Sequence, residues 1–75
     1  MYDSVEVAER VRIVARERGQ TLASVFSQAK LDKSTLTDYS RGSMPKADNL
    51  AKIADALDCS VDYLLGRTDR PEINR

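Results

Sequence analysis

The stretch LAKIADALDCSVDYLLGR, residues 50–67, decides the fold of this 75-residue chain. Apolar residues in its first half recur at spacings of three and four, which is the buried stripe of an amphipathic helix. These residues are Leu50, Ile53, Ala54 and Leu57. The second half begins at Ser60, a good N-cap, and closes at Gly66, a good C-cap residue. The pattern therefore predicts one helix over residues 47–57 and a short helix between Ser60 and Gly66.

The same periodicity predicts three earlier helices, over residues 4–18, 21–29 and 33–41. The expected caps of these helices are Asp3 or Ser4, Thr21 and Asp32. No stretch alternates apolar and polar residues for long enough to form a strand. The predicted fold class is therefore all-α, with five short helices. We expect a compact domain over residues 1–66 and a polar tail or linker stub over residues 67–75.

Composition narrows the function further. Twelve basic residues balance twelve acidic ones, histidine is absent, and 41% of the residues are hydrophobic, which is typical of a soluble globular domain. The single Cys59 cannot form an internal disulfide, and without histidine the chain offers neither a structural zinc site nor a thiol–imidazole nucleophile. No apolar run approaches the ~18 residues of a membrane span. We predict a cytoplasmic protein that is not an enzyme and that uses no metal, cofactor or membrane.

The first predicted helix carries four arginines outside its apolar stripe. These are Arg10, Arg12, Arg16 and Arg18. The same helix holds Glu6, Glu9 and Glu17, so we interpret the arginines as a solvated surface paired with these acids. Ile13 also lies outside the stripe, which makes it a candidate contact for a partner.

The predicted helix over residues 33–41 has little to bury. Leu36 and Tyr39 are its two large apolar anchors. Its other side chains are mostly hydrogen-bonding types, among them Lys33, Ser34, Thr37, Asp38 and Arg41. Such a helix is either simply solvated or presents donors and acceptors to a partner, and spacing alone leaves both interpretations open.

Two helices joined by a short turn, the second of them polar, make a helix-turn-helix. The stretch over residues 21–42, followed by Pro45 and by LAKIADALDCSVDYLLGR, resembles the phage-repressor and Cro-like family, also called XRE-type. The resemblance runs over residues 7–66, and the closing segment is its most specific part. It implies a lambda-repressor-like fold and a transcriptional regulator, a repressor of phage or prophage type. It also implies a homodimer that binds a palindromic operator in double-stranded DNA.

The resemblance implies a role for each polar residue of the helix-turn-helix. The helix over residues 33–41 would lie in the major groove as the recognition helix. The residues expected to face bases are Lys33, Ser34, Thr37 and Asp38. Those expected near the DNA backbone are Thr21, Thr35, Arg41, Ser43 and Lys46. The chemistry agrees, since a Lys can donate to guanine and an Asp can accept from the amino group of cytosine.

The charges are unevenly distributed along the chain. Residues 30–46 carry four bases and two acids, a net charge of +2, while residues 47–66 carry one base and four acids, a net charge of −3. Residues 1–29 balance at 0 and residues 67–75 add +1, so the sum is zero. The positive segment is therefore the one expected to contact DNA. A neutral chain predicts modest non-specific affinity, with specificity resting on base contacts and dimer geometry.

The chain departs from the family pattern at four places. Leu22 stands where the family usually has a Gln that reaches the DNA backbone, and Phe26 stands where a small Ala is usual. Lys30 replaces a Gly that adopts a positive φ, so we expect Lys30 in that conformation at some cost. Ala15 and Ser40 replace an Arg–Glu pair found in many members, so both halves of that pair are absent together.

The alternative function is an XRE-like protein-interaction module, an adaptor or antirepressor, that has lost DNA binding. Leu22, Lys30, Asp38 and the neutral net charge favour it. One exposed apolar patch formed by Leu22 and Ile13 would support a protein partner. A dimer interface is expected on the last two helices, through residues such as Val61, Tyr63 or Leu64.

Overall fold

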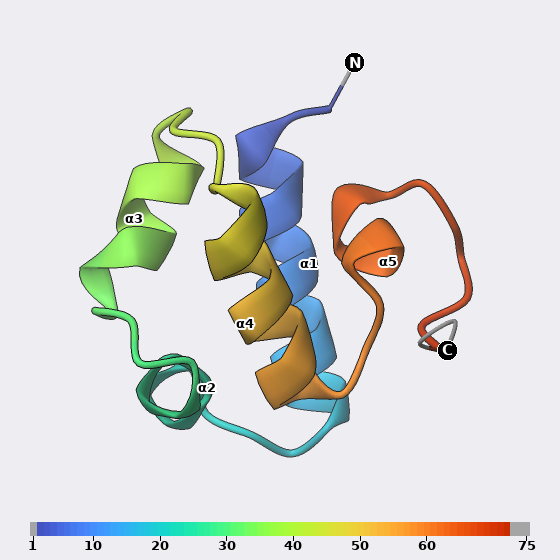
Figure 1. Ribbon diagram of the computed structural model, residues 1–75, viewed down its shortest axis with the longest axis horizontal. Coiled ribbons are helices and arrows are strands. Elements are labelled where there is room, and N and C mark those ends of the chain that lie inside the picture. Colours follow the sequence, from blue (N-terminus) through green and yellow to red (C-terminus); the bar gives the residue numbers. More distant parts are fainter. Residues whose placement is uncertain (1, 73–75) are drawn as a thin grey trace.

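The computed structural model describes residues 2–72, and this part of the chain contains five helices and no strand (Figure 1). They are α1 (Ser4–Glu17), α2 (Leu22–Gln28), α3 (Ser34–Ser40), α4 (Ala47–Leu57) and α5 (Val61–Leu65). The all-α prediction is confirmed. The predicted and observed helix bounds differ by at most one residue at each end, because the predicted bounds included capping residues that lie just outside the helices.

Helix α1 is the centre of the arrangement, because it contacts each of the other four helices. In Figure 1, α4 lies in front of α1, with α2 and α3 on one side and α5 on the other. The core between them consists of aliphatic side chains together with Phe26, Tyr39 and Cys59. Its largest fully buried members are Phe26, Ile53, Leu57, Leu64, Val7, Val11, Val14 and Val25. The apolar stripes predicted for α1, α2 and α4 therefore meet in one core.

Side-chain caps start three of the helices at the positions predicted for them. The carboxylate of Asp3 accepts a hydrogen bond from the backbone N–H of Val5 at 2.9 Å. The hydroxyl of Thr21 accepts from the N–H of Ser24 at 3.1 Å, and the hydroxyl of Ser60 accepts from the N–H of Tyr63 at 3.0 Å. Each cap satisfies a backbone donor that the first turn of a helix leaves unpaired.

Among residues 2–72, two residues other than glycine have a left-handed backbone. Lys30 has a φ of 59°, in the turn between α2 and α3, as predicted from its place in the family pattern. Asp58 has a φ of 55° and ends α4, where its N–H donates to the carbonyl of Asp55. The sequence pattern did not indicate the second of these, because no glycine or asparagine marks the end of α4.

The segment after α5 folds back onto the domain. The backbone N–H of Ser60 donates to the carbonyl of Pro71 at 2.8 Å. Arg67 lies 3.6 Å from the carboxylate of Asp62, and its guanidinium is 6.0 Å from the centre of the Tyr2 ring. Arg67 and Pro71 thus tie the start and the far part of this segment to the domain, while residues 73–75 of the predicted tail lie outside the described part. The domain boundary at residue 66 stays a prediction.

Candidate nucleic-acid interface

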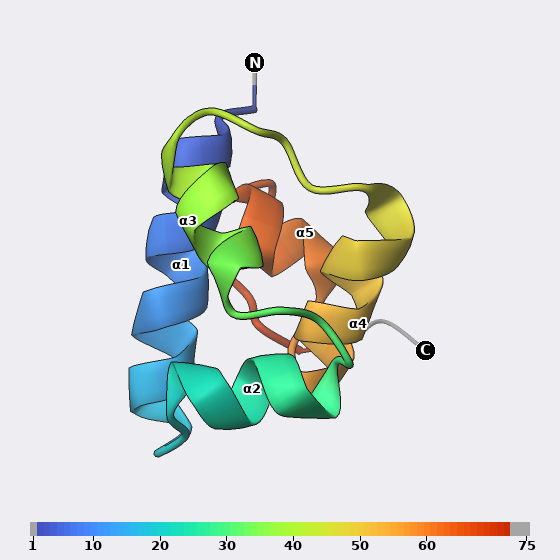
Figure 2. The ribbon, with the colours of Figure 1, turned by 90° about the vertical axis from the view of Figure 1, so that its left-hand side faces the viewer.

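Helix α3 has one buried side and one exposed side. Leu36 and Tyr39 are 5% and 4% exposed and anchor the helix on the core. The side chains on the opposite side are exposed, and they are Ser34, Thr37, Asp38 and Arg41. Figure 2 looks toward α3, which lies in front of α1 with α2 below it and α4 to its right. Four of the predicted DNA contacts therefore share one exposed helix face.

Asp32 fixes the start of this helix. Its carboxylate accepts a hydrogen bond from the backbone N–H of Ser34 at 2.9 Å, and its carbonyl accepts from the N–H of Thr35 at 3.0 Å. The backbone N–H of Ser34, and then its hydroxyl, lower the pKa of the Asp32 carboxyl below its ordinary value. Asp32 therefore supplies the capping hydrogen bond that was predicted for it, although α3 begins one residue later than predicted and the side chain of Lys33, directly before it, makes no capping bond. Lys33 adopts a helical backbone conformation next to this turn, and its side chain is exposed.

The predicted backbone contacts lie on three different elements. Arg41, Ser43 and Lys46 are exposed at the end of α3 and in the loop that leads to α4. The backbone N–H of Ser43 donates to the carbonyl of Asp38 at 3.0 Å, which ties the loop to the helix. Thr21 is exposed at the start of α2, where its hydroxyl serves as the cap, and Thr35 is half-buried on the flank of α3.

One contact that the sequence analysis missed joins α1 to the end of α3. Arg12 donates from Nη2 to the hydroxyl oxygen of Ser40 at 2.9 Å, and that hydroxyl donates to the carbonyl of Leu36 at 3.1 Å. Ala15, the family position for the arginine, is buried in the core. Ser40 thus has an arginine partner after all, and the partner comes from a place three residues earlier on α1.

The predicted pairing of the α1 arginines with Glu6, Glu9 and Glu17 is wrong, although Arg16 and Arg18 are exposed, as expected of a solvated surface. Within residues 2–72 the one ion pair is Arg67–Asp62, which belongs to the C-terminal segment. Arg12 reaches Ser40, Arg18 donates to the carbonyl of Asp58 at 3.2 Å, and Arg10 lies against Gly66. Three of the four arginines therefore contact other parts of the chain rather than acids of their own helix.

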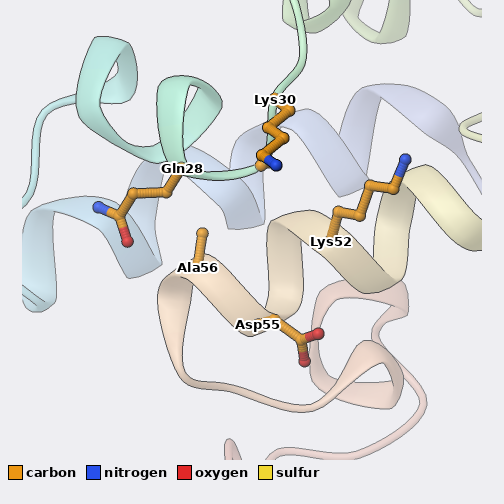
Figure 3. A pocket seen from close by; sticks show the side chains of 6 residues that line it. Gln28, Lys30, Lys52, Asp55 and Ala56 are labelled. Atoms are coloured by element: carbon orange, nitrogen blue, oxygen red, sulfur yellow. The ribbon is translucent and has the colours of Figure 1, made fainter.

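An open hollow lies between the helix-turn-helix turn and α4 (Figure 3). It is lined by Gln28, Ala29, Lys30, Lys52, Asp55 and Ala56. In Figure 3 the Lys30 side chain extends from the turn toward α4, which supplies Lys52 and Asp55. The left-handed backbone at the turn thus brings a second lysine to the side of α4.

Two buried titratable groups are unsuited to chemistry at neutral pH. Burial raises the pKa of the Cys59 thiol to about 11, so the thiol stays protonated and unreactive. The Tyr39 hydroxyl is buried and has no hydrogen-bond partner in the described part of the chain, and burial, followed by the charges of Asp38 and Asp48, raises its pKa. Residues 2–72 hold no group of three or more potential metal ligands. None of the helices in that range is long and apolar enough to cross a membrane.

These features define a class. A short capped helix, a tight left-handed turn and a second helix with an exposed polar face form a helix-turn-helix, in which α2 packs against α1 and α4 and α3 packs against α1. Residues 10–70 match the family model of the Cro/C1-type HTH DNA-binding domain. The chain therefore belongs to the Cro/C1-type helix-turn-helix family. Comparisons with curated proteins and with solved structures found no match.

Proposed function

We propose that this protein is a sequence-specific transcriptional repressor that reads the major groove of double-stranded DNA with α3. The observation that supports this most directly is the exposed polar face of α3, opposite its two buried anchors, in a chain of a DNA-binding family. Residues 30–46, which include α3 and the loop after it, also carry a net charge of +2. The function needs no metal, cofactor or membrane, and the cytoplasm is the compartment in which it would operate.

We assign the exposed side chains to two groups, those that contact bases and those that contact the DNA backbone. Lys33 and Ser34 stand at the start of α3, and Thr37 and Asp38 follow one turn later on the same face. Lys33 suits guanine, the Thr37 methyl suits thymine, and the Asp38 carboxylate suits the amino group of cytosine. The residues proposed to hold phosphates are Thr21, Thr35, Arg41, Ser43 and Lys46.

A homodimer on a palindromic operator completes the proposal. In this class two recognition helices enter half-sites about 34 Å apart, one turn of the double helix. Of the residues expected at the dimer interface, Val61 and Tyr63 are half-buried and remain available. Leu64 is 0% exposed and belongs to the core, so the expectation for Leu64 is wrong.

Selection of bound duplexes from a random DNA pool tests the whole proposal. The expected product is a palindrome whose half-sites lie about one helical turn apart. A single unpaired half-site would contradict the dimer, and no enrichment and no binding to any duplex at low salt would contradict DNA recognition itself. The selected duplex then serves as the probe for the variants described below.

The exposure of Leu22 does not support the joint apolar patch with Ile13 that would favour a protein-interaction module. Leu22 is half-buried and packs against the core, while Ile13 is 44% exposed on α1. Leu22 is therefore not exposed enough to form an apolar surface patch together with Ile13. The Leu22 that stands in place of the family's Gln therefore has one consequence, which is the loss of a polar side chain at the start of α2, next to the Thr21 cap.

A further inference from the structure

The side chain of Arg12 crosses from α1 to the end of α3. Its guanidinium donates to the hydroxyl of Ser40 at 2.9 Å, and both side chains are partly buried at this point. Helix α1 is also the helix against which α3 packs most extensively. Arg12 is therefore held in a defined position beside the recognition helix rather than extended freely into solvent.

Among residues 2–72, no carboxylate lies within ion-pair distance of the Arg12 guanidinium. A guanidinium keeps its charge at every pH that a protein tolerates, and it has five N–H donors. Ser40 is neutral, and the one ion pair of residues 2–72 lies elsewhere, between Arg67 and Asp62. Donors and a full charge are thus left over after the contact with Ser40 is made.

Ser40 lies close to the exposed face of α3. Residues three apart in an α-helix are separated by about 60° around the helix axis, so Ser40 is the neighbour of Thr37 on the side of α1. The next residue, Arg41, is exposed. Arg12 therefore stands at the edge of the face that we propose to enter the major groove. In Figure 2, α1 runs along the left of α3, and α4 lies on the opposite side.

We infer that Arg12 is a DNA-backbone contact supplied by α1 and oriented by Ser40. The major groove is lined by phosphates on both sides. When the exposed face of α3 enters the groove, Arg12 would contact a phosphate on the side of α1. An arginine fork is well matched to a phosphate, and a fixed fork loses little freedom on binding. This contact would also compensate for the backbone contact that is lost because Leu22 stands in place of the family's Gln. This role rests on the proposed DNA binding.

The salt dependence of binding distinguishes a phosphate contact from a structural tie. Each phosphate contact steepens the slope of log Kobs against log [salt] by about 0.9. Arg12→Gln, which removes the charge and keeps an amide donor, should reduce the slope by that amount. The affinity gap between wild type and Arg12→Gln then narrows about 3.5-fold between 50 and 200 mM salt. The loss should be equal on the selected duplex and on an unrelated duplex of the same length.

Two matched variants control for charge and for folding. Arg12→Lys keeps the charge and should keep the slope, with weaker binding because the fork is lost. Arg18→Gln removes the same charge from a residue that contacts the end of α4, and it should leave the slope unchanged. A lower urea midpoint of Arg12→Gln with an unchanged slope would make Arg12 a structural tie and overturn the inference. Failure of the wild type to bind any duplex would overturn the proposed function together with the inference.

Discussion

Helices α3 and α4 distribute their residues between core and surface in different ways. Helix α4 buries four of its eleven residues, and these are Leu50, Ile53, Ala54 and Leu57. Helix α3 buries Leu36 and Tyr39 of its seven residues, and none of the residues that the structure describes forms a hydrogen bond with the buried hydroxyl of Tyr39. Helix α1 buries six residues, so α1 and α4 contribute more buried residues to the core than α3, whose other side chains face outward. Substitutions in the two helices should accordingly affect different measurements.

The largest expected effect is a loss of stability from truncation in α4. Ile53 is 0% exposed, so Ile53→Ala removes buried methyl groups and leaves a cavity, at a cost of about 2–5 kcal/mol of unfolding free energy. Urea unfolding followed by circular dichroism measures this as a lower midpoint. Lys52→Ala, at an exposed neighbour on the same helix, should change the unfolding free energy by less than about 0.5 kcal/mol. Similar midpoints for the two variants would contradict the assignment of the core.

The next effect concerns binding and comes from α3. Lys33→Ala should weaken binding to the selected duplex by about 1–3 kcal/mol and relax the preference at one base pair, with the urea midpoint unchanged. Lys46→Ala, in the loop, should weaken binding to all duplexes equally and reduce the salt slope by about 1. Titrations of both duplexes at several salt concentrations separate the two results. If Lys33→Ala behaves as described for Lys46→Ala, Lys33 contacts a phosphate instead of a base.

The features predicted correctly from sequence are those that depend on a few neighbouring residues. A cap links a side chain to a backbone N–H two or three positions away, so Asp3, Thr21, Asp32 and Ser60 could be assigned without knowing the fold. The buried stripes follow from helical periodicity in the same local way. The left-handed Lys30 was accessible through the family pattern, since a glycine is usual at that place.

The features that were missed depend on how distant segments pack. Arg12 and Ser40 are 28 positions apart, and Arg18 reaches a carbonyl 40 positions away. A long arginine side chain can choose among many partners, and only the packing of α1 against α3 decides between them. The same holds for the contact of Ser60 with Pro71, which no local pattern indicates. The exposed face of α3 was predictable from periodicity, whereas the contribution of α1 to its edge was not.

The N-caps of α2 and α5 allow a matched test, in which the expected change in unfolding free energy is smaller. Thr21→Ala and Ser60→Ala each remove a side-chain acceptor from the first turn of a helix, and each should cost about 1 kcal/mol of unfolding free energy. Only Thr21 is a proposed phosphate contact, so only Thr21→Ala should also weaken DNA binding at concentrations where both variants are folded. Equal losses of DNA affinity would show that the effect passes through stability alone.

The smallest expected effect is a gain, and it concerns the left-handed residues Lys30 and Asp58. The left-handed conformation costs a residue with a Cβ atom about 1–2 kcal/mol, while glycine loses about 0.5–1 kcal/mol in backbone entropy when it is fixed. Lys30→Gly should therefore raise the unfolding free energy by roughly 0.5–1 kcal/mol. Asp58→Gly should gain less, because aspartate tolerates this conformation better than lysine.

Lys30→Ala provides the control for the loss of charge beside Lys52 in the hollow, since alanine keeps the backbone strain. It should leave the unfolding free energy within about 0.5 kcal/mol of the wild type. If Lys30→Ala raises the unfolding free energy as much as Lys30→Gly does, the destabilisation in the wild type comes from repulsion between Lys30 and Lys52. A gain from glycine alone would locate it in the backbone of the turn. In that case the cost comes from the left-handed conformation of Lys30 itself, in the turn that joins α2 to the proposed recognition helix.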